Sequence, residues 1–131
     1  MGIKKNKKIV FIVEDNDAYR ILIGRMLEQR GFSVLMFRNG VKALEMLQYI
    51  IPSIILSDIE MPVMDGFMLY EKINELYPNT SIPFQYISST SKIDVIEKAN
   101  VLSVHKLVKK PVQAEELSNI LTLGINKFAE A

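Results

Sequence analysis

The chain has 131 residues, of which 49% are apolar and 24% charged, values typical of one soluble globular domain rather than a disordered segment. Its formal net charge of +1 creates no overall field that would recruit nucleic acid or an anionic membrane. The absence of cysteine excludes disulfides, thiolate metal sites and cysteine nucleophiles, and no apolar stretch approaches the roughly 20 residues of a membrane span.

The chain begins with a lysine-rich stretch, which we interpret as a solvated basic arm over residues 1–8. The apolar run that follows, residues 9–13, predicts a strand. This run is too short for the core of a signal peptide, which needs about 7–15 apolar residues. The predicted location is therefore cytoplasmic.

The first half of the chain alternates strand and helix patterns. Asn16 or Asp17 can cap a helix that ends near Gly31, and residues 32–37 predict a second strand. Asn39 or Gly40 opens a second helix before a third strand at residues 53–58. The predicted core-facing residues of the two helices are Ala18, Ile21, Leu22 and Met26, and then Val41, Leu44 and Leu47.

The second half continues the alternation. A third helix follows Gly66, a fourth strand spans residues 83–87, and a helix over 91–100 carries only a thin apolar stripe. A fifth strand is predicted at residues 104–108, followed by a last helix from Gln113. The predicted core-facing residues of the three helices are Leu69, Ile73 and Leu76, then Ile93, Ile96 and Ala99, and finally Leu117, Ile120, Leu121, Ile125 and Phe128. Gln85 within the fourth strand should find a hydrogen-bond partner.

Five strands that alternate with five helices predict an α/β fold with a doubly wound parallel sheet. We found no internal repeat, low-complexity tract or linker in the sequence. We therefore expect a single domain over residues 1–131, with no part of the chain left for a DNA-binding or enzymatic output domain.

Three of the predicted strands end in charged residues. Glu14 and Asp15 follow the first strand, Asp58 ends the third, and Lys110 follows the fifth. The carboxyl ends of parallel strands meet at one edge of an open α/β sheet, and ligands bind there. The sequence therefore predicts one site that contains three carboxylates and a lysine.

These carboxylates need a counter-charge. Two unit charges about 4 Å apart repel by roughly 4 kcal/mol at an effective dielectric near 20, and Lys110 offsets only one of the three. Mg²⁺ suits the remaining excess, because it accepts carboxylates together with waters and a phosphate oxygen. A carboxylate beside Mg²⁺ and a lysine can act as a nucleophile toward phosphorus, so Asp58 is the candidate phosphoacceptor. A hydroxyl or amide donor would come from the run Ser88-Ser89-Thr90-Ser91.

At this point the sequence resembles the receiver domains of bacterial two-component response regulators, over about residues 7 to 128. The matching pieces, in order, are VEDN, SDIEMPVMDGF, IPFQYISS and KKP. The resemblance implies the flavodoxin-like (βα)5 fold, with a five-stranded sheet in the order 2-1-3-4-5. It is of the single-domain type similar to the chemotaxis response regulator.

The family resemblance also implies roles for individual residues. Asp58 would accept a phosphoryl group, and Lys110 and the Ser88 hydroxyl would contact it, with the backbone amide of Ser89 as a further donor. Mg²⁺ would be bound directly by Asp15, Asp58 and the backbone carbonyl of Glu60. Glu14 would act largely through a bound water. Glu60 and Thr90 would also flank the phosphoryl group, where the family tunes hydrolysis.

The sequence departs from the family pattern at two positions. Leu107 occupies a position that is usually Tyr or Phe, and Ser88 replaces the commoner Thr. The aromatic residue normally moves together with the hydroxyl. We therefore do not carry the family's usual route from the phosphate to the surface over to this chain.

The resemblance implies a partner that supplies phosphate, either a sensor histidine kinase or a histidine phosphotransfer protein. The output would be binding of a downstream protein or onward phosphotransfer, through the surface of the fourth helix, fifth strand and last helix. Apart from self-catalysed phosphotransfer to Asp58 and autodephosphorylation, we expect no enzyme activity. Direct nucleic-acid or membrane binding is not expected.

Two other functions remain open from the sequence. A receiver-like binding module could work without phosphorylation, and Leu107 is the feature that favours it. A Mg²⁺-dependent phosphatase with an aspartyl-phosphate intermediate would need a second acid two residues after its nucleophile, and Glu60 stands there. However, no segment resembles the cap that selects substrates in such enzymes.

Overall fold

The computed structural model describes residues 7–129, in which five parallel strands form one sheet in the order β2-β1-β3-β4-β5. The predicted fold class and strand order are therefore confirmed. Residues 1–6 of the predicted basic arm lie outside the described residues. The strands are β1 (Ile9–Val13), β2 (Ser33–Phe37), β3 (Ile54–Asp58), β4 (Phe84–Ser88) and β5 (Val108–Lys109). The helices are α1 (Asp17–Gln29), α2 (Gly40–Leu47), α3 (Gly66–Leu76), α4 (Ile93–Leu102) and α5 (Ala114–Ala129).

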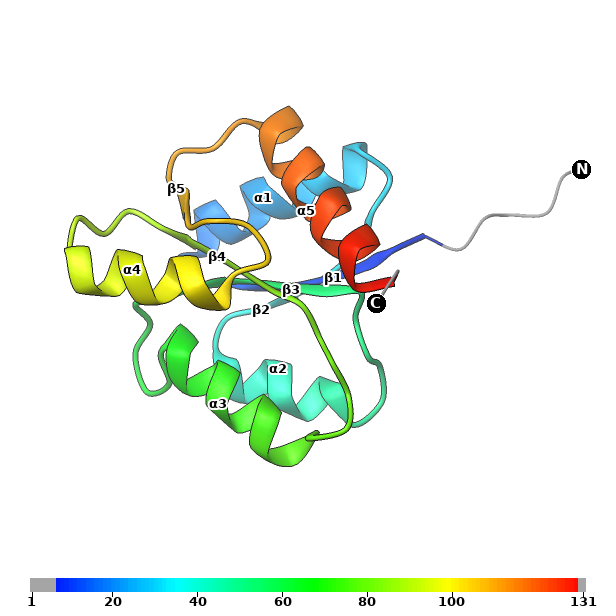
Figure 1. Cartoon of the computed structure of the whole chain (residues 1–131). Coiled ribbons are helices and arrows are strands. Elements are labelled where there is room, and N and C mark those ends of the chain that lie inside the picture. The colour runs from blue at the N-terminus through cyan, green and yellow to red at the C-terminus, as the bar shows by residue number, and fades with distance from the viewer. Residues whose placement is uncertain (1–6, 130–131) are drawn as a thin grey trace, which may run out of the picture.

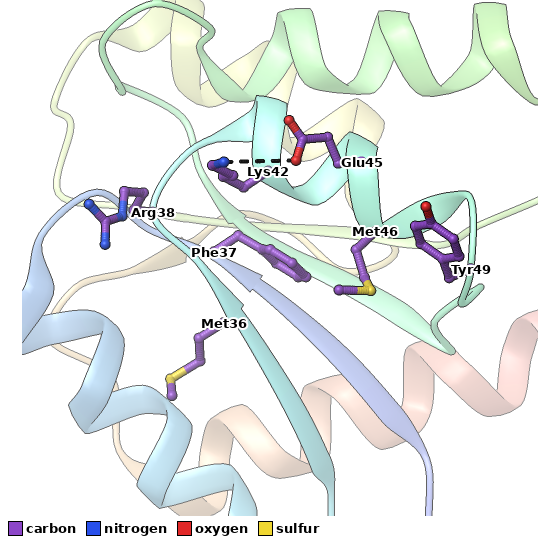
Figure 2. A pocket seen from close by; sticks show the side chains of 7 residues that line it. All are labelled: Met36, Phe37, Arg38, Lys42, Glu45, Met46 and Tyr49. Carbon is purple, nitrogen blue, oxygen red and sulfur yellow. Dashed lines mark ion pairs between the residues drawn. The ribbon is translucent and has the colours of Figure 1, made fainter.

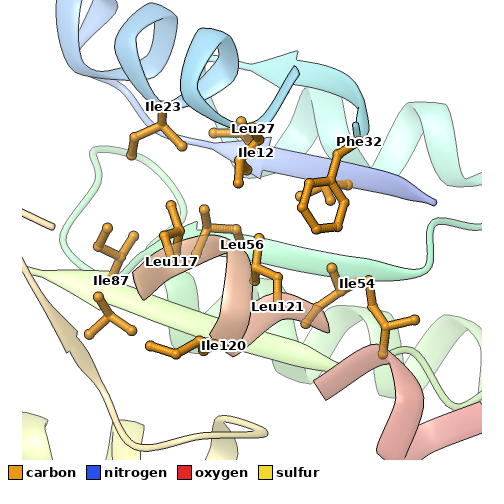
Figure 3. Packing of buried hydrophobic residues seen from close by; sticks show 13 residues of the cluster. Ile12, Ile23, Leu27, Phe32, Ile54, Leu56, Ile87, Leu117, Ile120 and Leu121 are labelled. Carbon is orange, nitrogen blue, oxygen red and sulfur yellow. The ribbon is translucent and has the colours of Figure 1, made fainter. Parts of the chain in front are cut away.

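The helices cover both faces of the sheet. Helices α1 and α5 lie on one face, and α2 and α3 lie on the other (Figure 1). Each face packs its own apolar cluster, and Figure 3 shows the cluster between the sheet and helices α1 and α5. Because both faces are covered, β3 and β4 are buried along their whole length, which explains their nearly continuous apolar sequences.

Side-chain caps fix where the first three helices begin. Asn16 caps α1, Asn39 caps α2 and Asp65 caps α3, and each side chain accepts the backbone N–H three residues further on at 2.8–2.9 Å. Of the alternatives left open by the sequence, Asn16 rather than Asp17 and Asn39 rather than Gly40 are the capping residues. The caps fix the directions in which the helices leave the sheet edge that carries the charged residues.

The predicted core face of α1 is wrong. Ala18, Ile21 and Leu22 are exposed and Met26 is only partly buried, whereas Ile23 and Leu27 are fully buried. The run Ile21-Leu22-Ile23 contains apolar residues on adjacent faces, so spacing alone did not determine which face meets the sheet. The contact with β2 determines it, since a side chain on Gly24 would overlap the Met36 sulfur.

Smaller corrections apply to the other helices. Val41 in α2, Leu76 in α3 and Ile93 in α4 are exposed, although each was predicted to face the core. They lie in the first or last turn of their helices. In α5 the predicted residues Leu117, Ile120, Leu121 and Ile125 are buried; the side chain of Phe128 lies outside what the structure describes.

The fifth strand is shorter than predicted because of Gln85. The structure assigns only Val108–Lys109 to β5, not residues 104–108. The Gln85 side chain accepts the backbone N–H of His105 at 3.1 Å and donates to the carbonyl of Lys106 at 3.0 Å. It thus bonds backbone groups that a ladder with β4 would otherwise use, and the predicted partner for this buried amide is found.

Gly66 lies directly under the strand that carries Asp58. A Cβ at this position would come within 2.3 Å of the Asp58 carbonyl oxygen and 2.9 Å of the Tyr86 ring. The Tyr86 hydroxyl donates to the Gly66 carbonyl at 2.7 Å, and the Gly66 N–H donates to the Ile59 carbonyl at 2.7 Å. Close backbone approach, rather than an unusual dihedral angle, therefore requires glycine here.

Among residues 7–129, no helix is long and apolar enough to cross a membrane.

We expect Gly66→Ala to lower the free energy of unfolding by about 1–3 kcal/mol, because the overlap is with backbone atoms that cannot move aside easily. Gly31→Ala is a suitable comparison: its φ of +96° disfavours alanine, yet nothing lies within 4 Å of the added Cβ. Urea unfolding of the two variants should show the larger loss for Gly66→Ala. A Gly66→Ala protein as stable as the wild type would contradict the close approach.

Candidate functional site

The charged residues predicted from the sequence meet at the carboxyl ends of β1, β3 and β5. The Lys110 ammonium lies 2.5 Å from the Glu14 carboxylate and 3.1 Å from Oδ2 of Asp58. Glu14 is 1% exposed and Asp58 7% exposed, so both carboxylates are largely withdrawn from water. Lys110 thus contacts two acids that lie 96 and 52 positions before it in the sequence.

The two oxygens of the Asp58 carboxylate have different partners. Oδ1 accepts the backbone N–H of Ile59 at 2.7 Å, while Oδ2 faces Lys110. The amide fixes the orientation of the carboxylate at the end of β3. The neighbouring Ser57 donates its hydroxyl to the Asp58 carbonyl at 2.7 Å, so the strand end itself is also held.

Backbone and side-chain contacts hold Glu14 in place. Its carboxylate accepts the backbone N–H of Asn16 at 3.1 Å, and its carbonyl accepts from the Arg20 guanidinium at 2.8 Å. Its own N–H donates to the Phe37 carbonyl at 3.0 Å. The end of β1 is therefore tied both to the first turn of α1 and to β2.

Asp15 completes a group of three carboxylates. It is exposed, and one oxygen from each of Glu14, Asp15 and Asp58 lies within 4.8 Å of the other two. Burial and the adjacent Glu14 raise the pKa of Asp15 above its ordinary value. Opposite ligands of an octahedral Mg²⁺ stand about 4.2 Å apart, so the spacing and the all-oxygen donor set fit this ion. The charges fit as well, since three carboxylates exceed one ammonium by two.

Lys110 is held in the charged state by its neighbours. Burial alone would lower the pKa of its ammonium, but the hydrogen bond to Glu14 and the charge of Asp58 outweigh burial and raise that pKa. The ammonium also lies 4.5 Å from the centre of the Tyr19 ring. Tyr19 therefore adds a cation–π contact to the two ion pairs that fix the position of the lysine.

Hydroxyl groups lie at the end of β4. Ser88 is buried, and its oxygen accepts the backbone N–H of Thr90 at 3.1 Å, which leaves its own O–H able to donate. The Ser88 carbonyl accepts the N–H of Lys110 at 3.0 Å, so the hydroxyl and the lysine lie on adjoining backbone. Ser89 is exposed, and Thr90 is buried.

Glu60 lies at the exposed mouth of the group. Its carboxylate pairs with Lys92 at 3.6 Å, and both side chains are more than half exposed. The structure thus brings Glu14, Asp58 and Lys110 into direct contact, with Asp15 beside them, whereas the Glu60 side chain turns toward the start of α4.

The sequence analysis identified neither Tyr19 and Arg20, which position this group, nor the contact that Lys109 makes beside it. Tyr19 and Arg20 lie in the first turns of α1, and Lys109 donates from its ammonium to the Thr90 carbonyl at 2.6 Å. The Asn16 cap places Tyr19 and Arg20 near the start of the helix that follows Glu14, but no local pattern indicates their contacts with the charged group. Lys109 carried no signal of its own beyond its place next to Lys110.

The chain matches a protein family over most of its length. The model of the response regulator receiver domain family matches residues 10–122. The response regulator receiver protein CpdR of Brucella abortus is 34% identical over 113 residues, which cover 86% of this chain and 92% of CpdR.

A longer protein and a solved structure agree with this match. The DNA-binding transcriptional regulator NtrC of Escherichia coli is 30% identical over 122 residues, and the match covers 93% of this chain but only 26% of NtrC. A CheY-like receiver domain of Methanospirillum hungatei superimposes with a TM-score of 0.82 at 21% identity, covering 95% of this chain and 98% of that one. With strand order, charged site and family match in agreement, the chain belongs to the response regulator receiver domains of two-component systems.

Proposed function

We propose that this receiver domain accepts a phosphoryl group on Asp58 from the phosphohistidine of a sensor histidine kinase or histidine phosphotransfer protein, with Mg²⁺ as cofactor. The observation that carries the proposal is the contact between Oδ2 of Asp58 and Lys110 beside two further carboxylates. The domain then signals by binding a downstream protein or by passing the phosphoryl group on. Its only catalysis would be this self-catalysed transfer and the later loss of the phosphoryl group.

The transfer requires little covalent chemistry from the protein. An oxygen of the Asp58 carboxylate forms the new bond to phosphorus, while the bond to the donor imidazole breaks and leaves its electron pair on nitrogen. Charge spreads over the three equatorial phosphoryl oxygens during the transfer. Lys110 and the Ser88 O–H would donate to these oxygens, together with the exposed backbone amide of Ser89.

Asp15 and Asp58 would bind Mg²⁺ directly, with the Glu60 carbonyl as a third ligand and Glu14 acting largely through water. When bound, the ion would neutralise the excess of two negative charges and polarise the phosphoryl oxygens. Asp15 is the acid most open to solvent in this group, so it gives the ion a route to the buried carboxylates.

The signal would leave the site through the segment that joins β4 to α4. Ser88 accepts the N–H of Thr90, and the Thr90 hydroxyl oxygen accepts the N–H of Lys92, the residue that precedes α4, at 3.2 Å. If the Ser88 side chain rotates to bring its O–H to the phosphoryl group, its oxygen moves away from the Thr90 N–H, and a contact that holds the segment before α4 is lost. This route does not need an aromatic residue at Leu107, whose N–H donates to Asn100 of α4 at 2.7 Å.

The proposed output surface includes α4, β5 and α5. Ile93 and Val101 of α4 and Leu123 of α5 are exposed apolar residues on this surface. Only Ala99 of α4 is buried, so the helix has few apolar contacts to hold it and can shift readily. Because the chain spans about a quarter of NtrC, output domains of such relatives give no direct guide to its partner.

The phosphoacceptor can be tested by mass. Incubation with Mg²⁺ and acetyl phosphate should add about 80 Da, the mass of one phosphoryl group, to the intact wild-type protein and nothing to Asp58→Asn. An adduct that survives in Asp58→Asn would assign a different acceptor. Absence of any adduct with the wild type would favour a phosphorylation-independent module, and rapid turnover of phosphomonoesters would favour the phosphatase.

Lys110 and Lys109 offer a matched pair of variants. Lys110→Met should slow phosphorylation of Asp58 by about a hundredfold, as expected for the loss of one donor to a developing anion. Without Mg²⁺ it should also lower the free energy of unfolding by about 1–3 kcal/mol, because Glu14 and Asp58 lose their shared cation. Lys109→Met removes the same charge, but it removes only a part-buried contact to the Thr90 carbonyl and no contact to Glu14 or Asp58, so both effects should be smaller than in Lys110→Met. Equal effects in the two variants would show that Lys110 contributes only net charge.

The route to α4 can be separated from the chemistry with two serine variants. Phosphorylation should speed hydrogen exchange in residues 93–102 of the wild type and of Ser89→Ala, which keeps its backbone amide. Ser88→Ala should still be phosphorylated, yet the exchange rate of α4 should be the same with and without phosphate. A phosphate-dependent change of α4 in Ser88→Ala would contradict the route through Thr90.

A further inference from the structure

Strand β2 forms one end of the sheet, and no described strand pairs with its outer side. Its sequence, SVLMF, contains neither a charge nor a proline, which are the usual means of protecting an edge strand from pairing. Met36 in this strand is 44% exposed. The edge is therefore suited to pair with another strand.

The hydrogen bonds to β1 determine which backbone groups face outward. The N–H of Ser33 donates to the Lys8 carbonyl, and the Phe37 carbonyl accepts the N–H of Glu14. In a parallel ladder, alternate residues direct both backbone groups to the same neighbour. Ser33, Leu35 and Phe37 thus use theirs on β1, whereas Val34 and Met36 direct an N–H and a C=O each to the open side.

The surface beside this edge is hollowed at both ends. A hollow of about 600 Å³ includes Met36, Phe37 and Arg38 at the end of β2, and α2 forms its far wall (Figure 2). A second hollow of about 380 Å³ includes Glu28 and Val34 at the start of the strand. The surface at both ends of β2 is therefore recessed, which leaves room for an approaching strand.

We propose that two copies of the chain pair through their β2 edges as an antiparallel two-fold dimer, which continues the sheet across the interface. With the axis beside Leu35, Val34 of each copy stands opposite Met36 of the other. Every outward N–H and C=O of these two residues then finds a partner, because the pattern is its own complement under two-fold rotation.

The charges at the two ends of β2 favour the same arrangement. Arg38 follows the strand and Glu28 lies near its start, and both are exposed. Arg38 lies near the start of α1: Met36, two residues earlier, contacts Gly24 of that helix, and the pKa of Asp17 is lowered mainly by Arg20 and to a smaller extent by the charge of Arg38. An axis perpendicular to the sheet keeps the two α1 helices on one face, so Arg38 of each copy approaches Glu28 of the other.

A second copy fits this edge better than an unrelated extended peptide, because both the backbone groups and the end charges are self-complementary. Neither Arg38 nor Glu28 belongs to the ion pairs formed within residues 7–129. A net charge of +1 per chain adds little repulsion between copies. The dimer also leaves β5, at the opposite end of the sheet, open to a signalling partner.

A charge exchange tests the dimer directly by sedimentation over a concentration series. The wild type should move from the 15.0 kDa monomer toward twice that mass as concentration rises. Arg38→Glu and Glu28→Arg should each weaken association about tenfold or more, by placing like charges together across the axis. The double variant should restore association to near the wild-type value, a rescue that pairing with any other protein would not produce.

A second pair of variants addresses the backbone. Met36→Pro removes an N–H that points outward and no hydrogen bond inside the chain, so it should abolish the dimer while the monomer stays folded by circular dichroism. Met36→Leu keeps the N–H and should still dimerise. The proposal is overturned if the wild type is monomeric at concentrations on the order of 1 mM, well above the weak end of specific association. It is equally overturned by a dimer that both Met36→Pro and the single charge reversals leave intact.

Discussion

The contact of one ammonium with two buried carboxylates is the interaction on which this structure depends. Glu14 and Asp58 come from separate strands, and their charges would repel by roughly 4 kcal/mol at 4 Å and an effective dielectric near 20. Lys110 reaches both of them from a third part of the chain. It therefore holds the ends of β1 and β3 together in the absence of a metal ion. With Asp15 counted, the group keeps an excess of two negative charges, and that excess is what creates affinity for a divalent cation.

The burial of the central strands makes this charged group possible. Strands β1 and β3 are covered on both faces, so their ends cannot move apart without exposing apolar side chains. Gly66 and the Tyr86 hydroxyl fix the backbone after Asp58, and Arg20 fixes the carbonyl of Glu14. The repulsion between the carboxylates is thus opposed by packing and hydrogen bonds outside the charged groups themselves. This arrangement is typical of sites whose geometry must be in place before a ligand arrives.

The sequence predicted the strands and the charged rim, because each depends on local patterns: a short apolar run, the residue that ends it and the alternation with helices. The strand order came instead from the resemblance to the receiver family. Prediction from local patterns failed where two patterns fitted equally well. The run Ile21-Leu22-Ile23 allows more than one helical face to meet the sheet, and only packing of Met36 against Gly24 decides between them. The length of β5 depends on Gln85, whose side chain bonds His105 and Lys106, residues 20 and 21 positions away. Tyr19 contacts Lys110 across most of the chain, and no local pattern indicates such a pair.

The two ends of the sheet are suited to different tasks. At the β5 end, Lys110 and Lys109 connect the charged group to the segment before α4, where few apolar contacts resist movement. At the β2 end, the Phe37 carbonyl holds the N–H of Glu14, but the outward groups of Val34 and Met36 face away from the site. A strand added at β2 would therefore make the same contacts whether or not Asp58 carries a phosphoryl group. Because coupling between two sites is reciprocal, a dimer that is insensitive to phosphorylation would leave the phosphorylation equilibrium unchanged as well. The proposed dimer and the proposed switch can thus operate independently, and only a shift of β2 relative to β1 would link them.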